Sequence, residues 1–405
     1  MFAILMLCGM SVGLSQLKVS PVMAELATSL GVTLDSAAWL MSVFTIAGVL
    51  LSIPGAGLLG KLGTKNTLLF LVGSLVAGNV LGAVATSFSM LFVSRVIEGI
   101  AAVFAVPVGV DFISRWFSGP AVGTATGIYM TATPIATFLA NSSALPLANA
   151  LGGIKSLWWI VGILDVVCFV LTLMFVRETP RDLPAAEGGA VTNVVAELRD
   201  SLGSKPLTLL CVSMFFLSYA LYSLITCYPQ LFTFYGLPAE TSNLLTSLNG
   251  LIGIPMSIIS GIIIGKTGKP YYVAFAGAAG ALATCATLSV LGDGTYAVNV
   301  IASAVFPAGI AVTPMFVLGP LLVRRSDLAP MGTCLMNTVF YLGQLVSTPL
   351  TTALTNNNSS WTLASIVLSI SCVLFFVFAF LSRKSLQAVR REFPDAMTQA
   401  AEVAA

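Results

Sequence analysis

The sequence contains no histidine and few charged residues. Only 8% of its 405 residues are Asp, Glu, Lys or Arg, whereas soluble globular proteins carry about 25%. Without histidine the chain lacks the commonest general base and metal ligand, so acid–base work falls to carboxylates. The formal net charge of +2 gives no reason to expect a nucleic-acid partner. Together with 57% hydrophobic residues, this shortage of charge predicts an integral membrane protein.

Motifs that carry chemistry are also scarce. The cysteines form no CxxC pair and lie in apolar runs, as is typical of small buried residues. The stretch Ser260-x-x-x-x-Gly265-Lys266-Thr267 resembles a phosphate-binding loop, but it has serine where glycine is required and follows an apolar run rather than a strand. We therefore expect no enzyme activity, no catalytic residue, no metal and no cofactor.

Apolar runs long enough to cross a bilayer, about 20 residues each, recur along the whole chain. The first run lacks a basic start and a small-residue cleavage site, so we interpret it as a span and not a signal peptide. The sequence predicts an all-α integral membrane protein with twelve transmembrane helices. The runs lie at 2–28, 37–59, 66–86, 89–112, 122–144, 156–176, 207–234, 243–264, 271–291, 297–322, 331–354 and 361–382.

Basic residues gather in alternate loops, which sets the orientation. By the positive-inside rule these loops are cytoplasmic, and both termini then face the cytoplasm. The opposite loops hold Lys155 alone among basic residues. The cytoplasmic set is Lys61, Lys65, Arg115, Arg177, Arg181, Arg199, Lys205, Lys266, Lys269, Arg324, Arg325, Arg383, Lys384, Arg390 and Arg391.

A polar stretch divides the chain into two six-helix halves. Residues 177–206 are rich in charge and proline and form a cytoplasmic linker between the halves at 1–176 and 207–382, and a cytoplasmic tail follows at 383–405. Within the linker, four apolar residues keep helical spacing, which predicts a short amphipathic helix at the membrane surface. These residues are Val191, Val195, Leu198 and Leu202.

The halves also share a turn. Gly60-Lys61-Leu-Gly63 follows the second span, and Gly265-Lys266-Thr-Gly268 follows the eighth, half a chain later. Such an echo indicates two pseudo-repeats. Glycines suit a tight turn, and lysines in these loops are placed to meet the last carbonyls of a neighbouring helix.

These turns resemble the loop motif of the major facilitator superfamily of transporters. Further matches are Leu91-x-x-x-Arg95-x-x-Glu98-Gly99 in the fourth span and Gly123-x-x-x-Gly127-x(6)-Pro134 in the fifth. Gln16-x-Lys18-x-x-Pro21 looks similar to the cyanate- and nitroimidazole-type bacterial branch. The resemblance implies a secondary transporter working by alternating access, with both turns as gating loops. Glycine stands at 60 and 265 where the family has aspartate, so a charge relay through that aspartate is not expected.

Four charged residues fall in the interiors of predicted spans: Lys18, Arg95, Glu98 and Asp165. Each costs about 2.5–3.5 kcal/mol at the centre of a span, which marks functional sites. Lys18 shares a face of the first span with Ser11 and Ser15, ahead of Pro21 as a kink. We expect Lys18 and Arg95 to bind an anionic substrate group and Glu98 to carry a coupled proton.

Each of these charges also has a structural interpretation. Arg95 could simply be neutralised by Glu98 one helical turn away. Asp165 lies on the sixth span, which the resemblance places at the periphery, where an acid facing lipid would serve structure rather than coupling.

The second half has no charge inside its spans, but polar and aromatic residues line one face of the seventh and the eleventh. Interhelical hydrogen bonds worth about 0.6 kcal/mol would explain any one of them. As a set, we expect them to line a substrate cavity, with Asn249 and Tyr129 as further members. The two stripes contain Tyr219, Tyr222, Thr226, Gln230, Asn337, Tyr341 and Gln344.

These features predict a monomeric transporter of a small organic anion or acidic polar solute in the lipid bilayer of a bacterial inner membrane. Proton coupling and exchange against a counter-anion both remain open. Proton-driven efflux of drugs by the same fold is the alternative. A channel or a membrane enzyme fits the residues less well.

Overall fold

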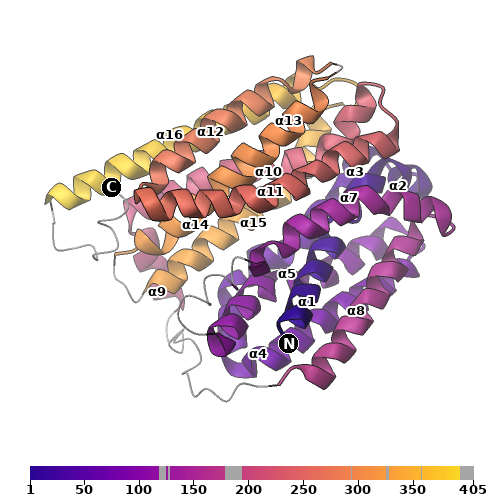
Figure 1. Ribbon diagram of the computed structural model, residues 1–405, viewed down its shortest axis with the longest axis horizontal. Coiled ribbons are helices and arrows are strands. Elements are labelled where there is room, and N and C mark those ends of the chain that lie inside the picture. The colour runs from indigo at the N-terminus through magenta and orange to yellow at the C-terminus, as the bar shows by residue number, and fades with distance from the viewer. Residues whose placement is uncertain are drawn as a thin grey trace. The chain divides into compact units, whose positions relative to one another are not determined.

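The computed structural model describes residues 1–117, 125, 128–177, 194–292, 294–324, 328–356 and 358–392. These residues are helical with short connections, and no strand occurs among them, as the apolar runs predict (Figure 1). In the first half the helices are α1 (Phe2–Leu17), α2 (Met23–Leu30), α3 (Leu34–Ser42), α4 (Ile46–Ala83), α5 (Phe88–Trp116), α7 (Ala132–Ala150) and α8 (Lys155–Phe175).

The linker and second half continue with α9 (Val194–Leu202), α10 (Lys205–Phe234), α11 (Ala239–Thr267), α12 (Pro270–Ala286), α13 (Tyr296–Ser303), α14 (Val312–Leu318), α15 (Ala329–Leu354) and α16 (Thr362–Glu392). A π-helical segment, Ala304–Ala311, joins α13 to α14. Helix α16 runs on through the first ten residues of the predicted tail, 383–392.

Ten segments in the described residues are long and apolar enough to cross a membrane. Helix α15 covers the predicted span at 331–354, and α7 covers residues 132–144 of the span predicted at 122–144. The all-helical membrane fold is therefore confirmed, and the count of twelve spans stays a prediction. The ten segments are Phe2–Leu30, Leu34–Ser52, Leu62–Ala83, Phe88–Ile113, Lys155–Phe175, Lys205–Phe234, Ala239–Thr267, Pro270–Val290, Tyr296–Leu321 and Thr362–Ala388.

The first two spans are both broken. Pro21 has no N–H to give to the carbonyl four residues back, and the chain passes from α1 through a 3₁₀ turn at Ser20–Val22 into α2. The kink expected at Pro21 is therefore present. A second 3₁₀ turn, Val43–Thr45, separates α3 from α4. Both breaks leave backbone carbonyls that need partners inside the membrane.

Each of the two repeated turns has a glycine with positive φ. Gly63 has φ = 74° and interrupts α4, and Gly268 has φ = 63° between α11 and α12. Positive φ is strained for residues with a side chain, so the glycines that echo each other in sequence meet the same steric demand. Lys65, just beyond the first turn, donates from Nζ to the carbonyl of Leu173 at 3.3 Å. That contact places a cation on the last turn of α8, as expected.

The helices group into two compact units, one of Met1–Val191 with Thr226–Leu251 and one of Thr192–Ile225 with Ile252–Ala405. In the first unit α4 packs against α5 and α8, and α1 packs against α5, α7 and α8. In the second unit α12 packs against α16 and the π-helical segment.

The predicted amphipathic helix of the linker is present as α9 in the second unit, with Val191 outside the described residues. Just after α9, Ser204 Oγ donates to the carbonyl of Leu322, and Arg324 donates to that of Gly203. Leu202 remains 45% exposed, and the place of this helix at the membrane surface stays a prediction.

Candidate functional site

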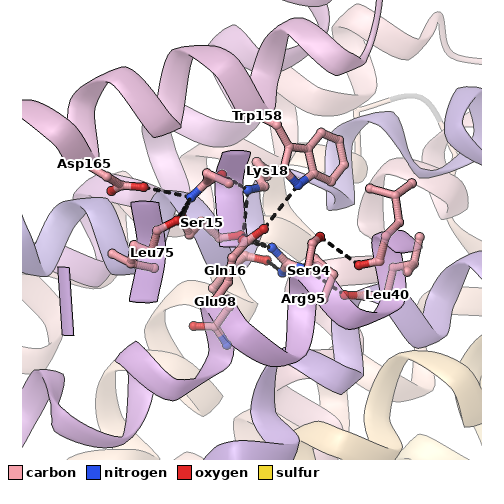
Figure 2. A network of polar contacts seen from close by, with 12 residues as sticks. Ser15, Gln16, Lys18, Leu40, Leu75, Ser94, Arg95, Glu98, Trp158 and Asp165 are labelled. Carbon is pink, nitrogen blue, oxygen red and sulfur yellow. Dashed lines mark hydrogen bonds and ion pairs between the residues drawn. The ribbon is translucent and has the colours of Figure 1, made fainter. Parts of the chain in front are cut away.

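The first unit buries four charged side chains in one polar network. Lys18 is 2% exposed, and Arg95, Glu98 and Asp165 are fully buried. Figure 2 shows these side chains converging from the end of α1, from α5 and from α8. The sequence predicts that each of these charges lies inside a span. The packing of four helices, α1, α4, α5 and α8, brings them together.

Glu98 is the centre of the network. Its Oε2 lies 2.9 Å from Lys18 Nζ and 2.6 Å from Arg95 Nη1. The indole Nε1 of Trp158 donates to Oε1 at 3.2 Å (Figure 2). Buried charges need both a counter-ion and satisfied hydrogen bonds, and Glu98 supplies one carboxylate to two cations.

Arg95 is fully engaged by protein acceptors. Beyond Glu98, it donates from Nη1 to the carbonyl of Ser15 at 2.5 Å, from Nη2 to that of Gln16 at 2.9 Å, and from Nε to that of Leu40 at 2.9 Å. These carbonyls lie next to the breaks in the first and second spans. This geometry matches the structural interpretation of Arg95, in which Glu98 neutralises it.

Asp165 points into the bundle and not toward lipid. It accepts hydrogen bonds from Ser11 Oγ and from Asn79 Nδ2, the latter at 2.7 Å. The expectation of a lipid-facing acid at the periphery is therefore wrong, because α8 turns this face toward α1 and α4. Within the described residues Asp165 forms no ion pair, in contrast to Glu98.

Asn79 joins the two carboxylate sites. Its Oδ1 accepts a hydrogen bond from Lys18 Nζ, while its Nδ2 donates to Asp165 and to Ser15 Oγ. Sequence reasoning missed Asn79 and Trp158. For Asn79 the signal in the sequence was an amide within an apolar run, between Gly78 and Gly82.

Those glycines allow close approach of the neighbouring helices. A Cβ on Gly78 would lie 2.4 Å from Glu98 Cγ, and one on Gly82 would lie 2.2 Å from Trp158 Cδ1. Small residues four apart are a common packing device between membrane helices. Lys18 Nζ also lies 4.8 Å from the centroid of the Trp158 ring, within the range of a cation–π contact.

The predicted neutral substrate residues are mostly buried and divided between the units. Tyr129 lies in the first unit, where its hydroxyl donates to the carbonyl of Ala105 at 2.6 Å. Tyr222 packs edge-on against Phe340 in the second unit, with ring centroids 5.6 Å apart. Thr226, Gln230 and Asn249 belong to the first unit, and Tyr219, Asn337, Tyr341 and Gln344 to the second. Contact of any of them with substrate stays a prediction.

The gating loops are described in part. The side chains of 53–61, Lys61 among them, and residues 123 and 127 lie outside the described residues, while Gly265 and Lys266 are exposed at the end of α11. Thr64, beside the Gly63 turn, donates to Asp111 near the end of α5. This contact ties the first turn to the fourth span without the family's aspartate. No cluster of three or more metal-ligating side chains occurs in the described part of the chain.

Three comparisons bear on identity. A sequence model of the Major Facilitator Superfamily matches residues 2–348. The protein named Uncharacterized MFS-type transporter YbcL, from Bacillus subtilis (strain 168), is 24% identical over 185 residues, which are 45% of this chain and 46% of that protein. The match thus spans about half the length of that relative.

Among solved structures, the chain is similar to a bacterial homolog to the human lysosomal transporter Spinster, in an inward-facing and unoccupied conformation. The TM-score is 0.76 over 98% of both chains, at 15% sequence identity. This likeness shows the fold. The resemblance to the cyanate- and nitroimidazole-type branch stays a prediction.

Proposed function

The chain belongs to the Major Facilitator Superfamily and is therefore a multi-pass membrane transporter and not an enzyme. We propose that it couples the transport of a small organic anion to that of protons. We also propose that the protein is a monomer in a bacterial inner membrane, with both termini in the cytoplasm. Transport would follow alternating access of the two halves, each moving around a site near the midplane.

The charge balance of the buried network carries this proposal. Lys18 and Arg95 contribute two positive charges, and Glu98 and Asp165 contribute two negative charges, all at 2% exposure or less. When one carboxylate takes up a proton, the network gains a net positive charge in a medium of low dielectric. An anion restores neutrality, so proton and anion are bound together. Anion exchange needs no such proton and is the other mode of coupling.

Lys18 is the cation that we assign to the substrate. Its ammonium is a compact charge on a flexible stem, whereas the guanidinium of Arg95 is fixed by three carbonyls and Glu98. Of the residues predicted for the cavity, Tyr129, Thr226, Gln230 and Asn249 belong to the same unit as Lys18 and would contribute neutral donors and walls to this site. Arg95 then positions the broken spans around it.

The test begins with purified protein and a thermal-shift screen of small anions, neutral solutes and lipophilic cations. The anion that stabilises most is then followed in proteoliposomes, where an inward proton gradient should accelerate its uptake. Lys18→Met should weaken binding about tenfold to hundredfold, because a hydrogen bond to a charged group is lost. Lys155→Met, at the exposed start of α8, is the matched control and should bind normally.

Proton-driven efflux of apolar or cationic drugs is the second candidate. It is favoured by the burial and pairing of both cations, because a substrate without negative charge need not reach them. Stabilisation by lipophilic cations alone, with Lys18→Met transporting them at the normal rate, would replace the anion proposal by this one.

A further inference from the structure

We propose that Asp165 is the proton-binding group of the buried network and that Glu98 stays ionised as a fixed counter-ion. The inference rests on the proposed proton coupling and names its site. It moves the role expected for Glu98 to a residue that sequence reasoning placed outside the mechanism. The two carboxylates have different surroundings.

The surroundings of Glu98 oppose a proton on it. Its partners are the ammonium of Lys18, the guanidinium of Arg95 and the indole N–H of Trp158, and all three are donors. A protonated Glu98 would direct its O–H at groups that cannot accept it. It would also leave two buried cations without the carboxylate that they share.

The surroundings of Asp165 suit both the ionised and the protonated carboxyl group. Ser11 donates to the ionised carboxylate, but its hydroxyl also has lone pairs and rotates freely enough to accept the O–H of a protonated Asp165. The displaced serine hydrogen can then turn to a backbone carbonyl one turn back on α1, as helical serines commonly do. Asn79 Nδ2 keeps its bond to the other carboxyl oxygen in either state. Proton uptake therefore forms one O–H bond and requires only a hydroxyl rotation.

Asn79 links this proton to Lys18. The charge of Asp165 draws the Nδ2 end of the amide, which leaves Oδ1 facing the ammonium. Protonation weakens that pull and therefore weakens the hold of Oδ1 on Lys18, while Glu98 remains the counter-ion of the ammonium. The network then carries a net positive charge, which attracts an anion to Lys18. Asp165 thus acts on the substrate site through one amide.

In the part of the chain that the structure describes, the other ionisable groups near Asp165 are few. Helix α1 and its end contribute Cys8 and Lys18, α5 contributes Glu98, and α8 itself contributes Cys168. Helix α4 presents the neutral Asn79, and α7 contains no ionisable residue. The positive charge of Lys18 opposes proton uptake at Asp165. A bound anion neutralises that charge, so binding of the anion and binding of the proton favour each other.

The test is infrared difference spectroscopy of the purified full-length protein between alkaline and acidic buffer. We expect a band from a buried protonated carboxyl group at acidic pH. Labelling with [4-¹³C]aspartate should shift this band in the unmutated protein, while labelling the glutamate side-chain carboxyl should leave it in place. Asp165→Asn should abolish the band, and Asp165→Glu should move it. Asp111→Asn removes a carboxyl near the end of α5 and should leave it unchanged.

A band that shifts with labelled glutamate, persists in Asp165→Asn or disappears in Asp111→Asn would overturn the assignment. So would the absence of any carboxyl band. The labelling arm needs no variant, so poor folding of Asp165→Asn leaves the test intact. The experiment uses no substrate, so failure of the anion proposal is visible separately, as an aspartate band in a protein that binds no anion in the thermal-shift screen.

Discussion

The first half of the chain buries Lys18, Arg95, Glu98 and Asp165, whereas the described residues buried in the second half are all uncharged. There the helices are joined by hydroxyl groups, such as Tyr271 with Ser382 at 2.9 Å and Ser213 with the carbonyl of Phe375 at 2.8 Å. Loss of one partner costs about 1–3 kcal/mol in a buried neutral pair and about 3–5 kcal/mol in a buried charged pair. The first half therefore holds charges whose balance changes when a proton binds. The second half holds neutral groups whose charge does not change with proton binding.

The largest expected effect is that of Glu98→Gln. The substitution leaves Lys18 and Arg95 without their shared carboxylate, and removal of one partner from a buried pair costs about 3–5 kcal/mol. Thermal unfolding in detergent should show a large fall in the melting temperature. A variant as stable as the parent would mean that the network is hydrated and that the contrast between the halves is false.

A smaller loss is expected from Gly78→Ala. The new Cβ would lie 2.4 Å from Glu98 Cγ and 2.8 Å from its backbone nitrogen, and overpacking costs about 1–3 kcal/mol. The control is Gly265→Ala in α11, where nothing lies within 4 Å of the added Cβ; it should be neutral or slightly stabilising in the same unfolding assay. Equal losses at both positions would contradict the packing described.

The repeated turns should respond alike in both halves. Gly63→Ala and Gly268→Ala each place a side chain on a backbone with positive φ, which costs about 1–2 kcal/mol. Similar shifts in melting temperature would sharpen the view that the halves share a plan and differ in charge. A loss confined to one turn would break the equivalence.

The smallest effect belongs to Tyr271→Phe in the second half. Ser382 Oγ donates to the carbonyl of Pro206 at 2.7 Å and so keeps a partner without the tyrosine hydroxyl. An interhelical hydrogen bond of this kind is worth about 0.6 kcal/mol. A loss as large as that of Glu98→Gln, measured in the same way, would show that neutral pairs carry as much stability as charged ones.

Much of the fold could be predicted from the sequence because its signals are local. Apolar runs predicted the spans, Pro21 predicted the break in the first, and the repeated glycines predicted turns that both contain a glycine with positive φ. Spacing along one helix also paired Arg95 with Glu98.

The cross-helix partners could not be predicted in this way. Lys18 with Glu98, and Asn79 with Asp165, are separated by 80 and 86 positions, and their meeting depends on how each helix is rotated about its axis. For the same reason the direction of Asp165 was predicted wrongly. Periodicity shows which residues share a face, but the face that meets a neighbour is set by packing.

The bonds of Arg95 to the broken spans have a consequence for biogenesis. Leu40 is synthesised 55 residues before Arg95, and Ser15 is synthesised 80 residues before it. Until the fourth span enters the bilayer, the carbonyls at both breaks lack the donor that satisfies them, and an unsatisfied carbonyl in lipid costs several kcal/mol. The carbonyls beside the first two breaks therefore gain these bonds only when the fourth span is in place.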